Sequence, residues 1–125
     1  MRALRPLAVL SATAAVIALG IGPAAANDIQ FSFHGASARY TDATDTLCAK
    51  AVNDTGAGLE DYAYALIQNA SGGTVASSPF ASQGQGWRCT GNLSIPEDRL
   101  YTLVLFDCTR IPGTDCGGTT RQFYS

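Results

Sequence analysis

The sequence predicts an all-β protein: a seven-stranded antiparallel Greek-key sandwich, or close to it, with two disulfides and an N-terminal signal peptide helix in front. Three observations predict this fold. Short runs of strand-forming residues are separated by Gly, Pro, Asn and Ser at spacings of about 8 to 12 residues, which is typical of a sandwich or barrel. The short chain contains an even set of four cysteines, and it begins with the pattern of an export signal.

The start of the chain is typical of a secretory signal. Arg2 and Arg5 precede an apolar run from Leu7 to Gly22, and the small residues Ala24–Ala26 follow, so we expect cleavage after Ala26. The alternative is an uncleaved membrane anchor, but the apolar run is shorter than the roughly 20 residues that cross a bilayer. We therefore predict a signal peptide over residues 1–26 and a single secreted, extracellular β-sandwich domain over residues 27–125.

The predicted mature domain is acidic. The sequence holds eight Lys and Arg and ten Asp and Glu, and without Arg2 and Arg5 these become six and ten, a net charge of −4. Nucleic acids and anionic membrane surfaces bind clustered basic residues, so we expect neither as a partner. We expect a monomer that binds a protein or a small molecule. No cofactor is expected, and no metal, because the C-x-x-C spacing of cysteine metal sites is absent.

All four cysteines, Cys48, Cys89, Cys108 and Cys116, lie in the predicted exported domain. Three pairings are possible. The Pro112-Gly113 dipeptide between Cys108 and Cys116 favours a turn, so we favour this pair, which leaves Cys48 with Cys89. In the loop-entropy model these closures stabilise the fold by roughly 2.5 and 4 kcal/mol respectively. We expect the two disulfides to tie the two sheets together.

Tyr101–Cys108 is the longest run of strand-forming residues. Both of its alternating faces are apolar, so we expect a central strand that is covered on both sides. Six further strands are expected around it: Asp28–His34, Thr46–Asn53, Tyr62–Asn69, Thr74–Ser78, Gly86–Ile95 and Thr119–Ser125. A helix is the alternative for Tyr62–Asn69, but the Ser71-Gly72-Gly73 turn favours a hairpin with Thr74–Ser78. The segment between the first two strands is expected to be a loop.

Two loops form the predicted binding surface. One carries Tyr40, Asp42 and Asp45, and the other, closed by the Cys108–Cys116 disulfide, carries Arg110, Ile111, Pro112 and Asp115. A closed loop is ordered before it binds and so loses little entropy on binding. The two aspartates of the first loop also offer oxygen ligands of the kind that calcium prefers. A turn held by aspartate side-chain hydrogen bonds explains the same residues without a metal.

The chain carries no recognisable catalytic pattern. It lacks the G-x-S-x-G elbow, the H-E-x-x-H motif and the phosphate-binding P-loop. His34 and Ser37 lie at the end of a strand without an oxyanion-hole pattern. The paired carboxylates Glu60-Asp61 and Glu97-Asp98 are adjacent, so each pair points to opposite faces of a strand or into water. We therefore predict that the protein is not an enzyme.

The segment Ile95–Tyr101 resembles the corner before the sixth strand of fibronectin type III and other immunoglobulin-like sandwiches. The resemblance implies a structural role for Tyr101, whose hydroxyl would hydrogen-bond to the backbone a few residues upstream. Two features depart from antibody-type domains: Cys108 follows Tyr101 by seven residues rather than two, and Trp87 is not placed between the cysteines of two sheets. The chain is also similar to small secreted bacterial sandwiches that include enediyne-chromophore carriers, which implies no particular activity.

Trp87 has the same parity as Cys89 along the expected strand Gly86–Ile95. We therefore expect the tryptophan to pack on the disulfide as a structural core residue rather than to form a ligand platform.

These observations lead to three functional hypotheses. The first is a secreted, non-enzymatic binding module that uses loops at one end of a rigid sandwich. The second is an inhibitor of a protease or glycosidase that presents the Cys108–Cys116 loop, with Arg110 exposed between the cystines. The third is a carrier of a small ligand.

Overall fold

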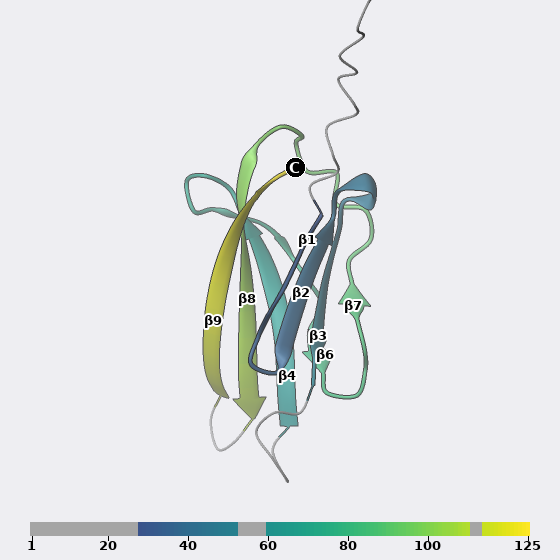
Figure 1. Cartoon of the computed structure of the whole chain (residues 1–125), viewed down its shortest axis with the longest axis vertical. Helices are drawn as coiled ribbons and strands as arrows, with labels where there is room; N and C mark the ends of the chain where they lie inside the picture. Colours follow the sequence, from purple (N-terminus) through teal and green to yellow (C-terminus); the bar gives the residue numbers. More distant parts are fainter. Residues whose placement is uncertain (1–27, 53–59, 111–113) are drawn as a thin grey trace, which may run out of the picture.

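The computed structural model describes residues 28–52, 60–110 and 114–125, and it is all-β, with two antiparallel sheets (Figure 1). The predicted signal peptide helix lies outside these residues. Among the described residues there are nine strands, two of them only two residues long. The fold class predicted from the sequence is therefore confirmed at the level of all-β antiparallel sheets with two disulfides.

The first sheet has the strand order β1-β2-β3-β7. Its strands are β1 (Ile29–Phe33), β2 (Ala36–Thr41), β3 (Thr46–Ala51) and β7 (Arg88–Cys89). A tight turn joins β1 to β2, and His34 occupies the left-handed region there with φ +51°. A short 3-10 turn, Asp42–Thr44, joins β2 to β3. These two connections lie at opposite ends of β2, so the first three strands form a meander.

The second sheet has the order β5-β4-β8-β9, and β6 also pairs with β4. Its strands are β4 (Glu60–Gln68), β5 (Thr74–Ser77), β6 (Ala81–Ser82), β8 (Leu100–Arg110) and β9 (Thr114–Tyr124). β8 lies between β4 and β9 and pairs with both along its length (Figure 1). The segment Tyr101–Cys108 is therefore part of a central strand, as its residues predict.

One hydrophobic core lies between the two sheets, and alternate residues of the long strands supply it. Its buried members on the five longest contributing strands are Ala36, Ala38, Tyr40, Leu47, Ala49, Ala51, Ala63, Ala65, Ile67, Leu103, Leu105, Tyr101 and Phe123. The small and large side chains are segregated: alanines face one another across β2 and β3 at one end of the core, whereas Tyr40 faces Leu47 at the other end. Burial of each large side chain stabilises the fold by about 1.5 to 3 kcal/mol.

The outer face of β8 is covered by side chains of its own sheet. Tyr64 on β4 stacks on Phe106 with ring centroids 4.6 Å apart. Phe80 makes T-shaped contacts with two tyrosines, with ring centroids 5.0 Å from Tyr64 and 5.8 Å from Tyr62. On the other side, Phe106 lies over Gly118 of β9, where an added Cβ would meet its ring at 3.3 Å. Aromatic rings thus provide the second covering that the apolar pattern of β8 predicts.

Three strand predictions were wrong. The last strand was expected over Thr119–Ser125, but β9 runs over Thr114–Tyr124. β2 was expected to be a loop, but Ala36, Ala38 and Tyr40 alternate inward along it and are fully buried. The expected strand Gly86–Ile95 is reduced to β7, because an Asx turn follows: the Asn92 side chain accepts hydrogen bonds from the backbone and hydroxyl of Ser94. Ser94 itself has φ +50°, which a strand does not allow.

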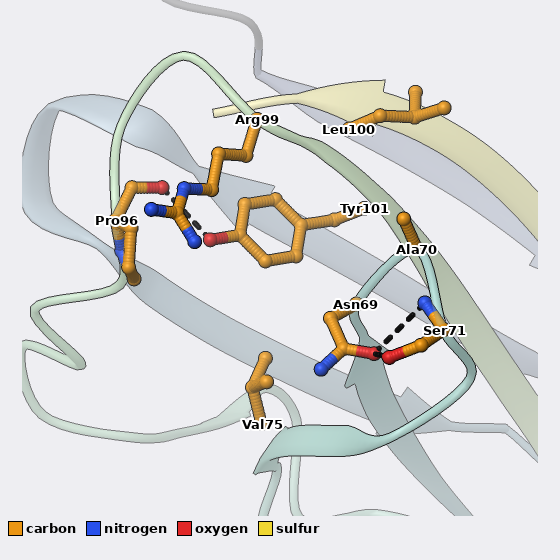
Figure 2. A pocket seen from close by; sticks show the side chains of 8 residues that line it. All are labelled: Asn69, Ala70, Ser71, Val75, Pro96, Arg99, Leu100 and Tyr101. Atoms are coloured by element: carbon orange, nitrogen blue, oxygen red, sulfur yellow. Dashed lines mark hydrogen bonds between the residues drawn. The ribbon is translucent and has the colours of Figure 1, made fainter.

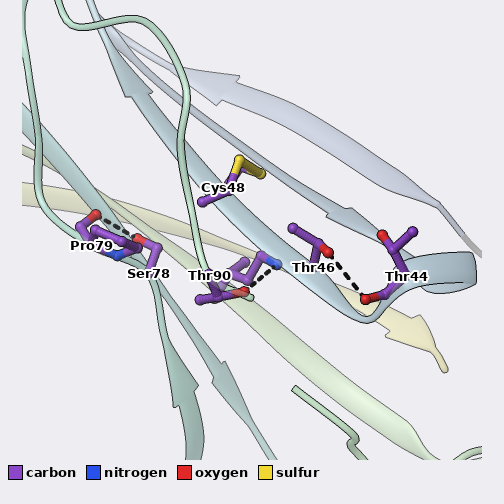
Figure 3. Close-up of a disulfide and its surroundings, with 8 residues drawn as sticks. Thr44, Thr46, Cys48, Ser78, Pro79 and Thr90 are labelled. Carbon is purple, nitrogen blue, oxygen red and sulfur yellow. Dashed lines mark hydrogen bonds between the residues drawn. A yellow bond between two sulfur atoms is a disulfide. The ribbon is translucent and has the colours of Figure 1, made fainter. Parts of the chain in front are cut away.

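Both favoured disulfides are present. Cys48 bonds to Cys89, and Figure 3 shows the disulfide at Cys48. Cys108 bonds to Cys116. In each case the two cysteines are directly opposite on neighbouring strands of one sheet, β3 with β7 and β8 with β9. The expectation that the disulfides tie the two sheets together is therefore wrong. Each one fastens a strand pair within a single layer.

Trp87 lies outside the hydrophobic core, contrary to expectation. It is half-buried, and the guanidinium carbon of Arg39 is 4.5 Å from its ring centroid. The Lys50 ammonium is 6.0 Å from the same centroid. The ring therefore makes cation–π contacts on the outer face of the first sheet, where Arg39 and Lys50 alternate with the inward residues of β2 and β3.

Candidate functional site

The structure does not bring the two predicted binding loops together. The first follows β2, where the Tyr40 ring lies 4.9 Å from Phe123, and Phe123 pairs with Tyr101 at the start of β8. Arg110 and Asp115 lie at the other end of β8 and β9. At about 3.3 Å per strand residue, the two ends are roughly 30 Å apart. Ile111 and Pro112, the remaining predicted residues, lie outside the described residues.

Tyr40 is fully buried in the core, so its side chain is not available to a partner. Its hydroxyl donates a hydrogen bond of 2.5 Å to Oδ1 of Asp45. Burial raises the pKa of the Tyr40 hydroxyl well above its ordinary value, and the hydrogen bond to Asp45 raises it further. Tyr40 and Asp45 therefore fix the turn between β2 and β3 rather than offer a binding surface.

The two aspartates of this turn differ in their hydrogen bonds. The Asp42 backbone N–H donates to Oδ1 of Asp28 at 2.8 Å, and Asp45 receives the Tyr40 hydroxyl. Among the residues that the structure describes, no three His, Cys, Asp or Glu side chains gather as a metal ion would require. A side-chain hydrogen bond therefore holds Asp45 in this turn, whereas Oδ1 of Asp42 is buried without a hydrogen-bond partner among the described residues.

His34 and Ser37 do not form a catalytic pair. Ser37 shares a hydrogen bond of 2.7 Å with the Ser32 hydroxyl, directly opposite it on β1. The His34 ring lies instead against Phe33, with centroids 4.3 Å apart. Both residues lie around the exposed β1–β2 turn.

A groove of about 510 Å³ lies at the same end of the molecule as Tyr101. It runs between the β4–β5 turn and the corner that precedes β8, and Figure 2 shows the side chains that line it. They are Asn69, Ala70, Ser71, Val75, Pro96, Arg99, Leu100 and Tyr101. Its size falls within the range of about 300 to 1,000 Å³ that is usual for small-molecule sites.

One wall of the groove is a turn held rigid by Asn69. The Asn69 Oδ1 atom accepts hydrogen bonds from the Ser71 backbone N–H at 3.1 Å, the Ser71 hydroxyl at 2.9 Å and the Gly73 N–H at 2.9 Å. These three donors fix which amide atom is the oxygen. The amide nitrogen points away from Ser71 and toward Val75 in Figure 2, and it also lies beside Gly73, where an added Cβ would meet it at 3.1 Å.

The opposite wall is the corner before β8. The Tyr101 hydroxyl donates a hydrogen bond of 2.8 Å to the carbonyl oxygen of Pro96, and Asp98 has φ +56° in the bend between them. Ser125 at the chain end closes the corner, since Asp98 donates its N–H to the Ser125 carbonyl. The bond predicted for Tyr101 is confirmed, and it orders the wall on which Arg99 stands.

Arg99 gives the groove its charge. The side chain is exposed, and within the described part of the chain its guanidinium has no ion pair or hydrogen bond. In Figure 2 it extends beside Pro96 and Tyr101. Val75, 43 % exposed, and half-buried Leu100 supply apolar surface to the same groove. The groove thus combines an apolar lining with two sets of hydrogen-bond donors, on Arg99 and Asn69.

The lining of the groove offers hydrogen-bond donors and apolar surface. It includes no histidine, cysteine or carboxylate, and its one serine hydroxyl donates to Asn69. No nucleophile is therefore paired with a base. Guanidinium and amide N–H groups instead recognise hydrogen-bond acceptors, and they do so most strongly when the acceptor is charged.

Comparison of the chain with models of protein families, with curated proteins and with solved structures gives no match. Within the described residues, no helix has the length and apolar character needed to cross a bilayer.

Of the residues that line the groove, only Tyr101 was given a role from the sequence, and that role was structural. Two local signals were present: Asn69 precedes Ala-Ser-Gly-Gly, a pattern typical of a side-chain-stabilised turn, and Arg99 stands two residues before the corner tyrosine. The sequence did not indicate that Asn69 and Arg99 lie close together in space. The two segments are brought together only because β4 and β8 are neighbours in the second sheet.

Proposed function

We propose that the protein is a secreted, non-enzymatic binding module that holds a small molecule in the groove between the β4–β5 turn and the corner before β8. The observation that carries this proposal is the unpaired Arg99 guanidinium beside exposed apolar surface in a groove of ligand size. Of the three functions that the sequence led us to consider, binding of a small ligand is the one that a described site supports.

The lining defines the chemical class of ligand. Val75 and Leu100 favour an apolar body, since each Å² of apolar surface removed from water contributes about 25 cal/mol. Arg99 and the Asn69 amide favour an anionic acceptor, and a hydrogen bond to a charged group contributes about 1.5 to 3 kcal/mol. The ligand is therefore an amphiphilic molecule with a carboxylate or similar anion at one end.

The finer features of the fold belong to the same proposal. The chain crosses between the sheets from β3 to β4, from β6 to β7 and from β7 to β8, and this order supports a Greek-key sandwich. The hydrogen bond from Tyr101 to Pro96 supports the likeness to fibronectin type III corners. Two disulfides support passage through an oxidising compartment, and hence secretion.

The inhibitor hypothesis remains a prediction from the sequence. It depends on the side chain of Arg110 and on residues 111–113, which lie outside what the structure describes. No observation at this end of the molecule favours it over ligand binding.

The proposal is tested with three probes that share one apolar body and differ in the head group: phenylbutyrate, phenylbutanol and phenylbutylamine. Nuclear magnetic resonance titration of the purified, oxidised protein should show the acid binding most tightly and the amine most weakly. The perturbed signals should include the Asn69 side-chain amide and the Leu100 backbone. If all three probes leave the groove signals unchanged, or if the amine binds best, the proposal is wrong.

Two variants sharpen this test. Arg99→Met keeps the apolar stem but removes the charge. It should lower the affinity for phenylbutyrate about tenfold and leave the affinity for phenylbutanol unchanged. Asn69→Asp keeps the oxygen that holds the turn but replaces the amide donor with a second acceptor. It should also lower the affinity for phenylbutyrate. Arg88→Met, an exposed arginine on β7 in the other sheet, is the matched control and should bind every probe like the unaltered protein.

A further inference from the structure

The two sheets have four edge strands, and three of them are short or interrupted. β7 has two residues and β1 has five. The edge beyond β4 is shared by β5 and β6, which are separated by Pro79, so it has no continuous row of backbone groups. Short strands and proline are the usual protections of a sheet edge against pairing with another chain.

The fourth edge, β9, has none of these protections. It runs for 11 residues in unbroken register with β8, from Leu100 opposite Tyr124 to Arg110 opposite Thr114. Thr114–Tyr124 contains no proline and no lysine. Figure 1 shows β9 at the outer margin of the second sheet, and within the described residues no strand pairs with its other side.

The register identifies which backbone groups point away from β8. Cys108 and Cys116 have Cα atoms 4.1 Å apart, the close spacing of a pair that does not exchange backbone hydrogen bonds. Ser125, of the opposite parity, does donate its N–H across to Arg99. The even-numbered residues of β9 therefore direct their N–H and C=O groups to the free edge, among them Cys116, Gly118 and Thr120.

The two charges of β9 are placed symmetrically about Gly118. Asp115 lies three residues before it and Arg121 three residues after it, and both have side chains on the same face of the strand. If two copies pair antiparallel about a two-fold axis at Gly118, each Asp115 lies directly opposite the Arg121 of the other copy. No other register of the same pairing places these charges opposite one another.

We infer that two copies of this chain associate edge to edge through β9, antiparallel, with the two-fold axis at Gly118. In this arrangement Cys116 pairs with Thr120 of the other copy and Gly118 pairs with itself. In the single chain, Nη1 of Arg121 donates to the Thr120 carbonyl at 2.9 Å, and its guanidinium lies 5.4 Å from the Phe31 ring centroid. In the dimer the side chain exchanges these contacts for Asp115 of the second copy. The Thr120 carbonyl then accepts an N–H from that copy. The pairing makes the protein a dimer where the sequence alone led us to expect a monomer.

The inference does not depend on the groove. The groove lies at the first residues of β8, on the side of the β4–β5 turn, whereas β9 pairs with the opposite side of β8. Sedimentation velocity of the purified, oxidised protein tests it across the micromolar range. We expect the sedimentation coefficient to rise with protein concentration from the value of a monomer to that of a dimer. If the unaltered protein sediments as a monomer throughout this range, the inference is wrong.

One variant removes a single edge group. Thr120→Pro deletes an N–H that points away from β8, a position where an edge strand tolerates proline. It should abolish the dimer while the far-ultraviolet circular dichroism stays that of the unaltered protein. A Thr120→Pro protein that folds and still forms the dimer with the original dissociation constant overturns the inference.

The charge pair supplies a second test, which remains informative if the proline variant does not fold. Asp115→Arg alone and Arg121→Asp alone should each raise the dissociation constant about tenfold, because like charges then face one another. The double variant restores opposite charges in exchanged positions and should return the constant to within about threefold. Arg88→Asp makes the same charge change outside β9 and is the matched control. If the double variant is as weak as the single ones, the register is wrong.

Discussion

The Tyr101 hydroxyl donates a hydrogen bond of 2.8 Å to the carbonyl oxygen of Pro96, five residues earlier in the chain. This bond closes the corner before β8, and the same corner carries Arg99 and forms one wall of the groove. Tyr101 is almost fully buried, and its ring packs 5.8 Å from that of Phe123. One side chain therefore links the core to the proposed binding site.

Removal of this bond should cost stability. We expect Tyr101→Phe to lower the free energy of unfolding by about 1 kcal/mol, the net value of a typical intramolecular hydrogen bond. Urea unfolding followed by circular dichroism measures it. Tyr64→Phe is the control, because the Tyr64 ring is stacked on Phe106 while its hydroxyl has no hydrogen bond within the described residues. Equal effects of the two variants would contradict the role of the corner bond.

The stability of the protein should fall at high pH through Tyr40. Its pKa is raised by burial and by Asp45 in the folded protein, so the unfolded chain loses this proton first, near pH 10. Below that pH the stabilisation is fully present. Above it, and until the folded pKa is reached, the free energy of unfolding should decline by about 1.4 kcal/mol per pH unit.

The matched variant for this prediction is Tyr40→Phe. It lacks the titrating hydroxyl, so the slope of its unfolding free energy between about pH 11 and 12 should be shallower than that of the unaltered protein by nearly the contribution of one proton. Urea unfolding at closely spaced pH values measures both slopes. Parallel curves for the two proteins would show that another group governs the alkaline loss.

The two disulfides should contribute unequally. Cys48 and Cys89 are separated by 41 residues, and Cys108 and Cys116 by 8. In the loop-entropy model, replacing the first pair with alanines costs about 4 kcal/mol and replacing the second about 2.5 kcal/mol. Urea midpoints of the two double-alanine variants give the comparison. A larger loss from the short loop would mean that native contacts, and not closure of the unfolded chain, dominate.

The alanines between the layers should resist enlargement. Ala65, at the centre of β4, is fully buried, and leucine at this position adds volume to a filled core. We expect Ala65→Leu to destabilise the protein by about 1 to 3 kcal/mol. Val75→Leu, at a site with an exposed side chain on the same sheet, should change stability by less than about 0.5 kcal/mol. Thermal unfolding of both variants distinguishes the two cases.

Elements that depend on local pattern were predictable from the sequence. β8 has two apolar faces, and β1 alternates Ile29, Phe31 and Phe33 with polar residues. The short disulfide followed from the turn chemistry of Pro112-Gly113, and the other pair followed by elimination. Each of these inferences uses residues close together in the chain, where sterics and alternation act directly.

Elements that depend on tertiary context were not predictable. β2 was not predicted as a strand, because its inward residues are mostly alanine and alanine indicates an apolar face only weakly. Tyr40 was also assigned to the binding surface and not to the core. Trp87 was assigned to the core because it shares the parity of Cys89 and because a lone tryptophan beside a disulfide is usually a core residue. The strand β7 begins only at Arg88, after the tryptophan. The groove requires Asn69 and Arg99, 30 residues apart in the sequence, and only the pairing of β4 with β8 brings them near each other.

The position of the two cystines within single layers has a mechanical consequence. Neither disulfide crosses from one sheet to the other, so apart from the chain connections only noncovalent contacts hold the layers against separation. A molecule pulled from its two ends can part its layers while both cystines stay intact. The residues between the cysteines of each pair then add nothing to the length of the stretched chain until a reductant breaks the disulfides.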